Sequence, residues 1–296
     1  MKKKMIGIIA LGTFLLLAGC SSKGEVKRDA HGRKVLSGYI TLSGAFALYP
    51  LAIQWVDEFH RLHPEVDIDI SAGGAGKGIT DVLADQVDIA MVSRELKPQE
   101  KERGALAFAV AKDAAVSTVN GNYPLYKRLL KTGWSMQSAQ EIWEGKTKLN
   151  VYTRSDACGA AETWAAFLGK KQEDLKGTGV FGDPGVAETL QKDVNGIGFN
   201  NIGYAYHDKT HKPTKGIAIV PIDVNDNGKL DEEEKFYGTL DELMEAIAKG
   251  KYPAPPARNL YLVTAGKPKN PVVVEFLKYV RTKGQRLNAP AGFVHI

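Results

Sequence analysis

The sequence has few cysteines and no apolar segment long enough to cross a membrane. It contains 2 cysteines, Cys20 and Cys158, too few for a framework of disulfide bonds. Its main apolar run, residues 5–18, is shorter than the roughly 20 residues that a spanning helix requires. There is also no internal repeat. These absences leave a globular, non-repetitive chain of 296 residues, long enough for two modest lobes.

The first 20 residues have the pattern of an export signal. Three lysines at positions 2–4 precede the apolar run, which ends in Leu17-Ala18-Gly19-Cys20. A charged start, an apolar middle and a small-residue end are typical of a signal peptide. The last four residues resemble a bacterial lipobox, in which the leader is cut before the cysteine and the thiol is lipidated. We therefore predict a signal peptide over 1–19 and a lipidated tether over 20–34.

This leader changes the meaning of the charge and of the cysteines. The formal net charge is +5 with the three leader lysines and +2 without them, so nucleic acid is not an expected partner. With Cys20 carrying a lipid, Cys158 has no partner and no disulfide is expected. The expected location is the cell envelope, either the periplasm or the cell surface.

A glycine-rich stretch from Ser71 to Arg94 is the strongest local signal. Alternating apolar residues at 66, 68 and 70 predict a strand, and glycines at 73, 74, 76 and 78 then predict a loop that runs into a helix. A helix N-terminus with unpaired N–H groups favours an anion. The nucleotide-binding P-loop pattern fails here, because Ser71 and Gly78 stand where it needs a glycine and a Ser or Thr. A dinucleotide site and a purely structural turn remain as alternatives.

The neighbouring segments extend this loop into a βαβαβ unit. We predict a strand over 39–42, a helix over 48–62, a strand from 66 and a strand over 87–92. Ligands of parallel sheets bind beyond the carboxyl ends of the strands. The loops at 43–47, 71–78 and 93–94 should therefore converge.

A second α/β unit follows. A strand over 150–152 leads into Arg154 to Glu162, RSDACGAAE, and a helix that begins near Ala160. The remaining expected elements are helices over 185–194, around 240–247 and around 273–280, and strands over 197–200, 217–222 and 260–264. We predict two lobes that face each other across a cleft, the first formed by 35–108 and roughly 256–296, the second by 109–255.

An ordered series of segments resembles one known family. The segments are SGAFALYPLAIQW, AGGAGKGI, VDIAMVSRE, YTRSDACGAAETW and NLYLVTAGKPKNPVVVEFLKYV, and the family is the solute-binding proteins of high-affinity phosphate ABC transporters. This resemblance implies an α/β fold of two lobes, each a mostly parallel sheet flanked by helices. It also implies one oxyanion in the cleft, an ABC permease as partner, a monomer, and neither enzymatic activity nor a catalytic cofactor.

The resemblance also assigns residue roles. Asp88 takes the place of a carboxylate that accepts a proton from the ligand, which predicts phosphate over sulfate. Arg154 takes the place of an arginine that faces the anion, with Asp156 as its ion-pair partner. The complete expected ligand set is Ser43, Gly44, Ala45, Phe46, Gly74, Ala75, Gly76, Lys77, Asp88, Arg94, Arg154, Asp156, Cys158, Gly159 and Ala160.

The chain departs from the family pattern at the side-chain hydroxyls. Alanine or phenylalanine stands at 45–47, alanine at 75, and Cys158-Gly159-Ala160 replaces Ser-Gly-Thr. Backbone N–H donors survive such changes, so phosphate stays the first choice of ligand. The alternative ligands are another oxyanion or a small organophosphate. The alternative function is that of a surface sensor or interaction protein with the same fold.

Several of these residues also have simpler interpretations. Arg94 can form an ion pair with Glu95 or with a cleft carboxylate. Asp88 can cap the start of its strand or form an ion pair there, and Lys77 can be a solvated surface lysine. Cys158 would be a nucleophile only with a base nearby. His207 and His211, four residues apart on a polar loop, are weak evidence for a metal.

One further motif predicts a metal. The segment from Asp223, DVNDNGKLDEEE, has the spacing of a calcium loop with Gly228 at its sixth position. An acidic surface turn is the alternative. The expected structural Ca²⁺ ligands are Asp223, Asn225, Asn227, Lys229, Asp231 and Glu234.

Overall fold

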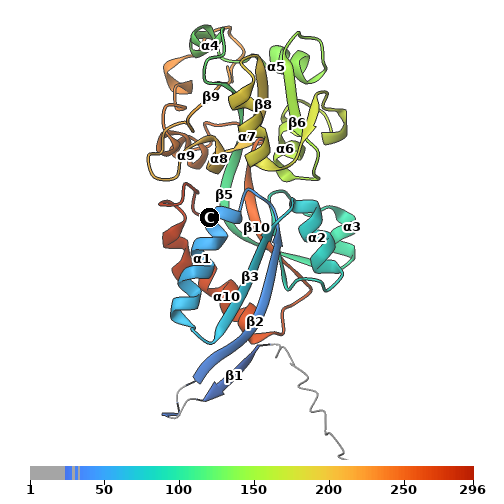
Figure 1. Ribbon diagram of the computed structural model, residues 1–296, viewed down its shortest axis with the longest axis vertical. Coiled ribbons are helices and arrows are strands. Elements are labelled where there is room, and N and C mark those ends of the chain that lie inside the picture. Colours follow the sequence, from blue (N-terminus) through green and yellow to red (C-terminus); the bar gives the residue numbers. More distant parts are fainter. Residues whose placement is uncertain (1–23, 29–30, 33) are drawn as a thin grey trace, which may run out of the picture.

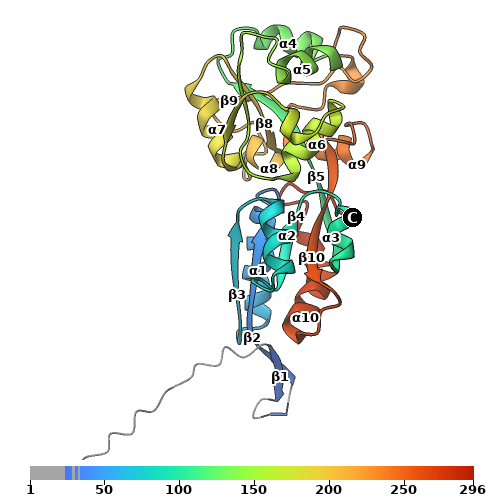
Figure 2. The ribbon, with the colours of Figure 1, turned by 90° about the vertical axis from the view of Figure 1, so that its right-hand side faces the viewer.

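The computed structural model describes residues 24–28, 31–32 and 34–296. The predicted signal peptide and Cys20 lie outside these residues. The described chain forms two α/β bodies stacked along the long axis (Figures 1 and 2). One core gathers buried residues between Leu36 and Ala111 with others between Leu260 and Phe293, and the second core lies between Ala114 and Tyr252. We call the body that contains Leu36 and Phe293 the first lobe, and the body that contains Ala114 and Tyr252 the second lobe.

The first lobe contains the predicted βαβαβ unit. Strand β2 (Lys34–Gly44) pairs in parallel with β3 (Val66–Ala72) and with β4 (Ile89–Val92). Helix α1 (Tyr49–Leu62) connects β2 to β3 and buries Leu51, Ala52, Trp55 and Phe59 at helical spacing. The other elements are β1 (Glu25–Arg28), which is antiparallel to β2, α2 (Ala75–Leu83), α3 (Pro98–Glu102), α10 (Pro271–Val280) and η3 (Lys283–Leu287).

Two antiparallel strands pass from one lobe to the other. They are β5 (Ala105–Asn120) and β10 (Ala257–Ala265), paired from Ala105 opposite Ala265 to Ala114 opposite Ala257. Both lie between the two bodies in Figures 1 and 2. In the described residues, 10 strands form one sheet, whose main path runs β1-β2-β4-β10-β5-β8-β6-β7. These two strands therefore join the lobes.

The second lobe repeats the strand–loop–helix pattern. Strand β6 (Asn150–Arg154) pairs in parallel with β7 (Thr178–Val180) and β8 (Gly196–Asn201), and β9 (Ile217–Ile219) is antiparallel to β5. Its core includes Trp143, Trp164 and Phe199, which contact one another. The helices are α4 (Tyr126–Thr132), α5 (Met136–Trp143), α6 (Gly159–Phe167), α7 (Gly182–Lys192), α8 (Ile202–Ala205), α9 (Leu240–Ala248), η1 (Gln172–Asp174) and η2 (Glu232–Glu234).

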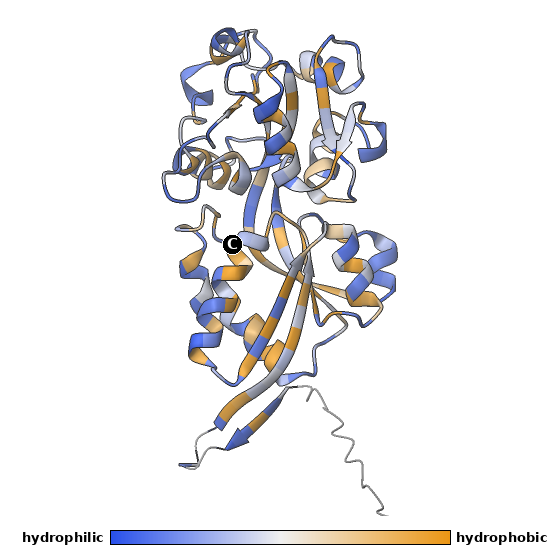
Figure 3. Ribbon diagram, viewed as in Figure 1, coloured by the Kyte–Doolittle hydropathy of each residue, from blue (hydrophilic) through white to orange (hydrophobic). Residues whose placement is uncertain are grey.

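The helices are amphipathic, as their sequence patterns predict. Hydrophobic and hydrophilic residues alternate along α1 and α10 (Figure 3), because one face of each helix packs on the sheet and the other meets solvent. Among the described residues, no helix has both the length and the apolar character that a membrane crossing needs.

Candidate functional site

The ends of β2, β3 and β4 meet in one place. The Gly44 carbonyl oxygen accepts hydrogen bonds from the N–H groups of Gly73 (2.8 Å) and Gly74 (3.0 Å). Gly44 has φ of 135°, and a Cβ there would lie 2.2 Å from the Met91 carbonyl oxygen. Only glycine fits this close approach of three strands. The structure thus brings the first two loops together at the carboxyl end of β4.

The glycine loop after β3 touches the second lobe. Gly74, with φ of 93°, is the N-cap of α2, and a Cβ there would lie 3.0 Å from a carboxylate oxygen of Asp156. The Gly76 N–H donates to the Ala157 carbonyl oxygen at 3.0 Å. The start of α2, including Ala75, therefore faces the loop that follows β6.

That loop brings a second helix N-terminus to the same place. Cys158 is the N-cap of α6, and its sulfur accepts from the Ala161 N–H at 3.5 Å. A Cβ on Gly159 would lie 2.0 Å from the Ser93 carbonyl oxygen, so Gly159 and Ala160 pack directly against the end of β4. The lobes are in close contact here, and the first turns of α2 and α6 both point their N–H groups toward the interface.

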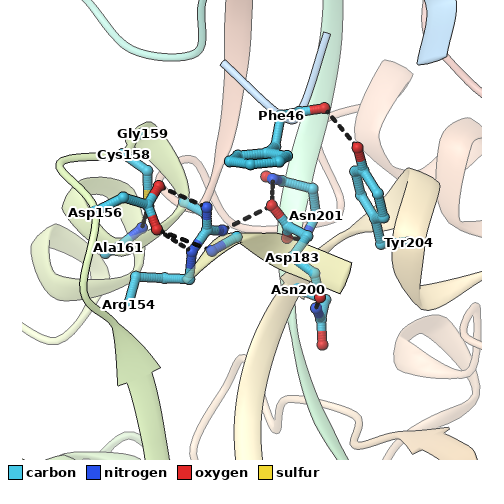
Figure 4. A network of polar contacts seen from close by, with 12 residues as sticks. Phe46, Arg154, Asp156, Cys158, Gly159, Ala161, Asp183, Asn200, Asn201 and Tyr204 are labelled. Atoms are coloured by element: carbon cyan, nitrogen blue, oxygen red, sulfur yellow. Dashed lines mark hydrogen bonds and ion pairs between the residues drawn. The ribbon is translucent and has the colours of Figure 1, made fainter. Parts of the chain in front are cut away.

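Arg154 lies beside these helix starts and is fully buried. Its Nε and Nη2 bind Asp156 at 2.8 and 2.7 Å, and its Nη1 binds Asp183 at 2.6 Å (Figure 4). Burial favours the neutral guanidine, but the charges of Asp183 and Asp156 prevail and raise the pKa of Arg154 above its ordinary value. The arginine is therefore permanently charged, and the expected Asp156 pair is present.

Arg154 has a second buried ion-pair partner, Asp183, which was not among the residues expected at the site. It lies in the first turn of α7 and is completely buried. Besides Arg154, its carboxylate accepts from the backbone and side-chain N–H groups of Asn201, both at 2.7 Å (Figure 4). An aspartate in a first helical turn is a common anion-to-dipole arrangement, and the Gly182-Asp183-Pro184 start of α7 was the signal available in the sequence.

Phe46 reaches across from the first lobe to cover Arg154. Its ring centroid lies 5.5 Å from the guanidinium carbon and 5.6 Å from the ring of Phe181, edge to face. The Tyr204 hydroxyl donates to the Phe46 carbonyl oxygen at 3.1 Å (Figure 4). The apolar ring, rather than a polar donor, is thus the contact that the first loop makes with Arg154.

Arg94 forms an ion-pair cluster at the contact between the lobes. Its Nη1 and Nη2 bind the Glu100 carboxylate at 2.8 and 2.7 Å, and its Nε lies 3.0 Å from Glu162 in the first turn of α6. Lys97 also pairs with Glu162, at 3.1 Å. Arg94 therefore connects the two lobes and has the pairing role that was the simpler interpretation.

Ser43 and Lys77 are engaged within the first lobe. The Ser43 hydroxyl donates to Asp81 at 2.6 Å, and the Lys77 ammonium pairs with the same carboxylate one helical turn along α2. The Lys77 side chain is 53% exposed, so it lies on the surface of α2 and its charge is screened by solvent.

The placement expected for Asp88 is wrong. β4 begins at Ile89, so Asp88 stands at the amino end of the strand and Ser93 at the opposite, carboxyl end. The Asp88 carboxylate accepts from the Thr41 N–H at 2.9 Å and lines a separate hollow together with Lys267 and Lys269. It cannot accept a proton from a ligand held between the lobes, and the phosphate-over-sulfate preference that rested on it has no support.

Cys158 lacks the properties of a nucleophile. Its side chain is buried, and burial raises the pKa of the thiol to about 12, although the charge of Arg154 opposes the shift. The thiol is therefore protonated at neutral pH and not a reactive thiolate. The histidines that were weak candidates for a metal site, His207 and His211, contact different carboxylates. His207 pairs with Asp208 and His211 with Asp241.

The predicted calcium loop is closed by hydrogen bonds. The Glu234 carboxylate accepts from the N–H groups of Val224, Asn225 and Asp231, and that of Asp223 accepts from those of Asn227 and Gly228. Lys229 forms an ion pair with Asp231. Within the described residues, no group of His, Cys, Asp and Glu side chains is placed to hold a metal ion. The calcium interpretation is therefore unsupported.

A cavity of about 730 Å³ opens beside the site. Lys97 of the first lobe and Lys170, Lys171 and Gln172 of the second lobe line it, together with residues of the segment Thr153 to Ala157. The lining contains three lysines and also Glu162 and Glu173, and Lys97 and Lys170 pair with glutamates.

The fold and the interface together define a class of protein. Two α/β lobes joined by crossing strands, with loops and helix N-termini of both lobes facing one another, are the architecture of binding proteins that close around a ligand by a hinge motion.

A family model described as "PBP superfamily domain" matches residues 30–283, and the chain belongs to this superfamily. The phosphate-binding protein PstS of Staphylococcus epidermidis is 23% identical over 99% of this chain and 89% of its own length. PstS of Bacillus subtilis is 27% identical over 70% of this chain and 73% of its own length. The expected fold class and the resemblance to this group of proteins are thereby confirmed.

Solved structures agree with this assignment of the fold. A putative phosphate ABC transporter substrate-binding protein with bound phosphate from Clostridium perfringens superposes with a TM-score of 0.71 at 19% identity, covering 88% of this chain and all (100%) of that one. An ABC-type phosphate transport receptor from Vibrio cholerae has a TM-score of 0.63 at 19% identity, covering 87% and 100%.

Proposed function

We propose that this chain is an extracytoplasmic receptor, anchored through a lipid on Cys20, that binds inorganic phosphate between its lobes and delivers it to an ABC importer. The observation that carries the proposal is the meeting of two helix N-termini, of α2 and α6, beside the buried Arg154 at the contact between the lobes. The N–H groups of Gly76 and Ala161 already donate within the interface, so the attraction for an anion comes from the other first-turn N–H groups and from the positive ends of the two helix dipoles. The receptor acts as a monomer without a catalytic cofactor.

The relatives support the choice of ligand and partner. Those from Staphylococcus and Bacillus are named phosphate-binding proteins, and the Clostridium structure contains phosphate. We propose the lobe boundaries 35–108 with roughly 256–296, and 109–255, and two large clusters of buried residues, which divide between Ala111 and Ala114, support a division close to this one.

The local charges indicate which donors bind the ligand. Arg154 carries one positive charge, whereas its partners Asp156 and Asp183 carry two negative charges. The side chains alone therefore do not attract an anion. Backbone N–H groups of the two helix starts must supply the attraction, and each hydrogen bond to a charged group contributes about 1.5–3 kcal/mol.

Thermal unfolding and calorimetry on phosphate-free protein test this function. Phosphate at about 100 times its dissociation constant should add about 2.7 kcal/mol to the free energy of unfolding, because it binds only the folded chain. Chloride and acetate at matched ionic strength are the controls. The absence of any melting shift with millimolar phosphate, arsenate or sulfate would exclude an oxyanion receptor.

A small organophosphate is the second candidate ligand. It is favoured by the cavity of about 730 Å³, whose lining includes three lysines, and by the lack of hydroxyl side chains at Ala75, Cys158 and Ala160. Glycerol phosphate and inorganic phosphate should be titrated in parallel. Tighter binding of the ester would identify the cavity as the place for its organic part.

A further inference from the structure

Phe46 belongs to the first lobe by sequence but to the second lobe by contact. It follows β2 on the loop that enters α1, yet its ring lies 5.5 Å from the guanidinium carbon of Arg154 and 5.6 Å from the Phe181 ring. These two partners come from β6 and from the N-cap of α7. One aromatic side chain therefore bridges the two lobes at the anion-binding loops.

The ring leaves Arg154 no free surface for a ligand. All three nitrogens in the plane of the guanidinium already bind Asp156 or Asp183, and the ring covers a face of the same group (Figure 4). The Arg154 side chain is 0% exposed. In this closed arrangement an oxyanion cannot reach the arginine unless the ring moves.

The second lobe has a fitted place for this ring. Gly182 has φ of 71°, and a Cβ there would lie 3.0 Å from the tip of the Phe46 ring. The Gly182 N–H donates to Asp156 at 3.1 Å, which holds this backbone beside Arg154. On the backbone side, the Tyr204 hydroxyl binds the Phe46 carbonyl oxygen at 3.1 Å.

We propose that Phe46 is an internal latch that closes the two lobes on each other without ligand and competes with the oxyanion for the space beside Arg154. The latch follows from the contacts alone, whereas the competition rests on the proposed function. If the closed, ring-occupied state prevails, only a fraction of molecules is competent to bind, and the apparent affinity falls by that fraction. Phe46 would then set the ligand concentration to which the receptor responds.

The experiment uses the chain from residue 20 onward, with Cys20→Ser in place of the lipidated residue. Phe46→Ala removes the ring, and Phe46→Leu keeps most of its volume without the aromatic face. Phe108→Ala is the matched control, because Phe108 makes the same kind of contact with Arg281, at 5.8 Å, within the first lobe. Small-angle scattering measures lobe opening without ligand, and calorimetry measures phosphate affinity.

Both substitutions of Phe46 should increase the radius of gyration without phosphate and tighten phosphate binding at least about tenfold, as expected when a tenth or less of the molecules is competent. Phe108→Ala should change neither. An unchanged radius in both Phe46 variants would overturn the latch. Opening with unchanged phosphate affinity would overturn the competition. Opening with no oxyanion binding in any variant would retain the latch and refute the proposed function. Should Phe46→Ala not fold, Phe46→Leu decides between the same outcomes.

Discussion

Arg154 and Asp183 form an ion pair of 2.6 Å in which both side chains are fully buried. Further polar contacts lead from this pair to the strands that join the lobes. Asn201 donates to Asp183 and accepts from Arg258, and Arg258 forms an ion pair with Asp113 at 3.2 Å. Asp113 and Arg258 lie on β5 and β10, the strands that join the lobes. A continuous polar network thus connects the candidate site to β5 and β10.

This network predicts a large effect of Asp183 on stability. Asp183→Ala leaves Arg154 with one carboxylate fewer and Asn201 without its acceptor, and breaking a buried pair costs about 3–5 kcal/mol. Urea unfolding measures the loss. The exposed pair of Lys192 and Glu188 on the same helix is the control, and Glu188→Ala should have no measurable effect. Equal effects of the two substitutions would contradict the network.

Asp113 predicts a pH dependence of stability. Burial raises the pKa of its carboxyl to about 6, although Arg258 opposes the shift. The folded state therefore binds a proton more tightly than the unfolded state, so the contribution is complete below about pH 4 and is lost as the pH rises through about 6. Relative to Asp113→Asn, wild type should lose about 3 kcal/mol of unfolding free energy across that range. Parallel pH profiles of the two proteins would show that Asp113 titrates normally.

The site should discriminate poorly between phosphate and sulfate. Strong rejection of sulfate requires a carboxylate that accepts a proton from the ligand. Asp88 lies at the far end of β4, bound to Thr41, and the carboxylates at the site, Asp156 and Asp183, already accept from Arg154. We expect the two dissociation constants to agree within about tenfold and Asp88→Asn to leave both unchanged. Competitive calorimetry decides the matter. A preference above about a hundredfold, lost in Asp88→Asn, would return Asp88 to the site.

Glu234 should stabilise the acidic turn directly. Its carboxylate accepts three part-buried backbone hydrogen bonds, and a hydrogen bond to a charged group contributes about 1.5–3 kcal/mol. Glu234→Ala should therefore lower the melting temperature, with exposed Glu232→Ala as control. Melting curves are also recorded with calcium and with chelator. A melting temperature that rises with calcium in wild type but not in Glu234→Ala would restore the calcium interpretation.

Local patterns predicted the fold well, because alternation and helical spacing are properties of short segments. They predicted α1, α2, α10 and the three parallel strands of the first lobe. They missed β5, Ala105–Asn120, because its many alanines favour helix over strand. Only its pairing with β10 and β8 makes this segment a strand.

The site was harder to predict than the fold. The glycine loops were found from local pattern, and the Arg154–Asp156 pair was found from the family resemblance. The same resemblance misplaced Asp88, because Asp88 precedes β4 and ligands of parallel sheets bind beyond the carboxyl ends of the strands. The contacts of Phe46 with Arg154 and of Asp183 with Asn201 join distant segments, so no local pattern contains them.

Calorimetric titration of phosphate into phosphate-free wild-type protein and the Phe46→Ala variant is the decisive measurement. We expect a single saturable site in both proteins, tighter by at least about tenfold in the variant, and a melting temperature that rises with phosphate in each. Neither heat of binding nor a melting shift in either protein, up to millimolar phosphate, would contradict the claim that this chain is a phosphate receptor.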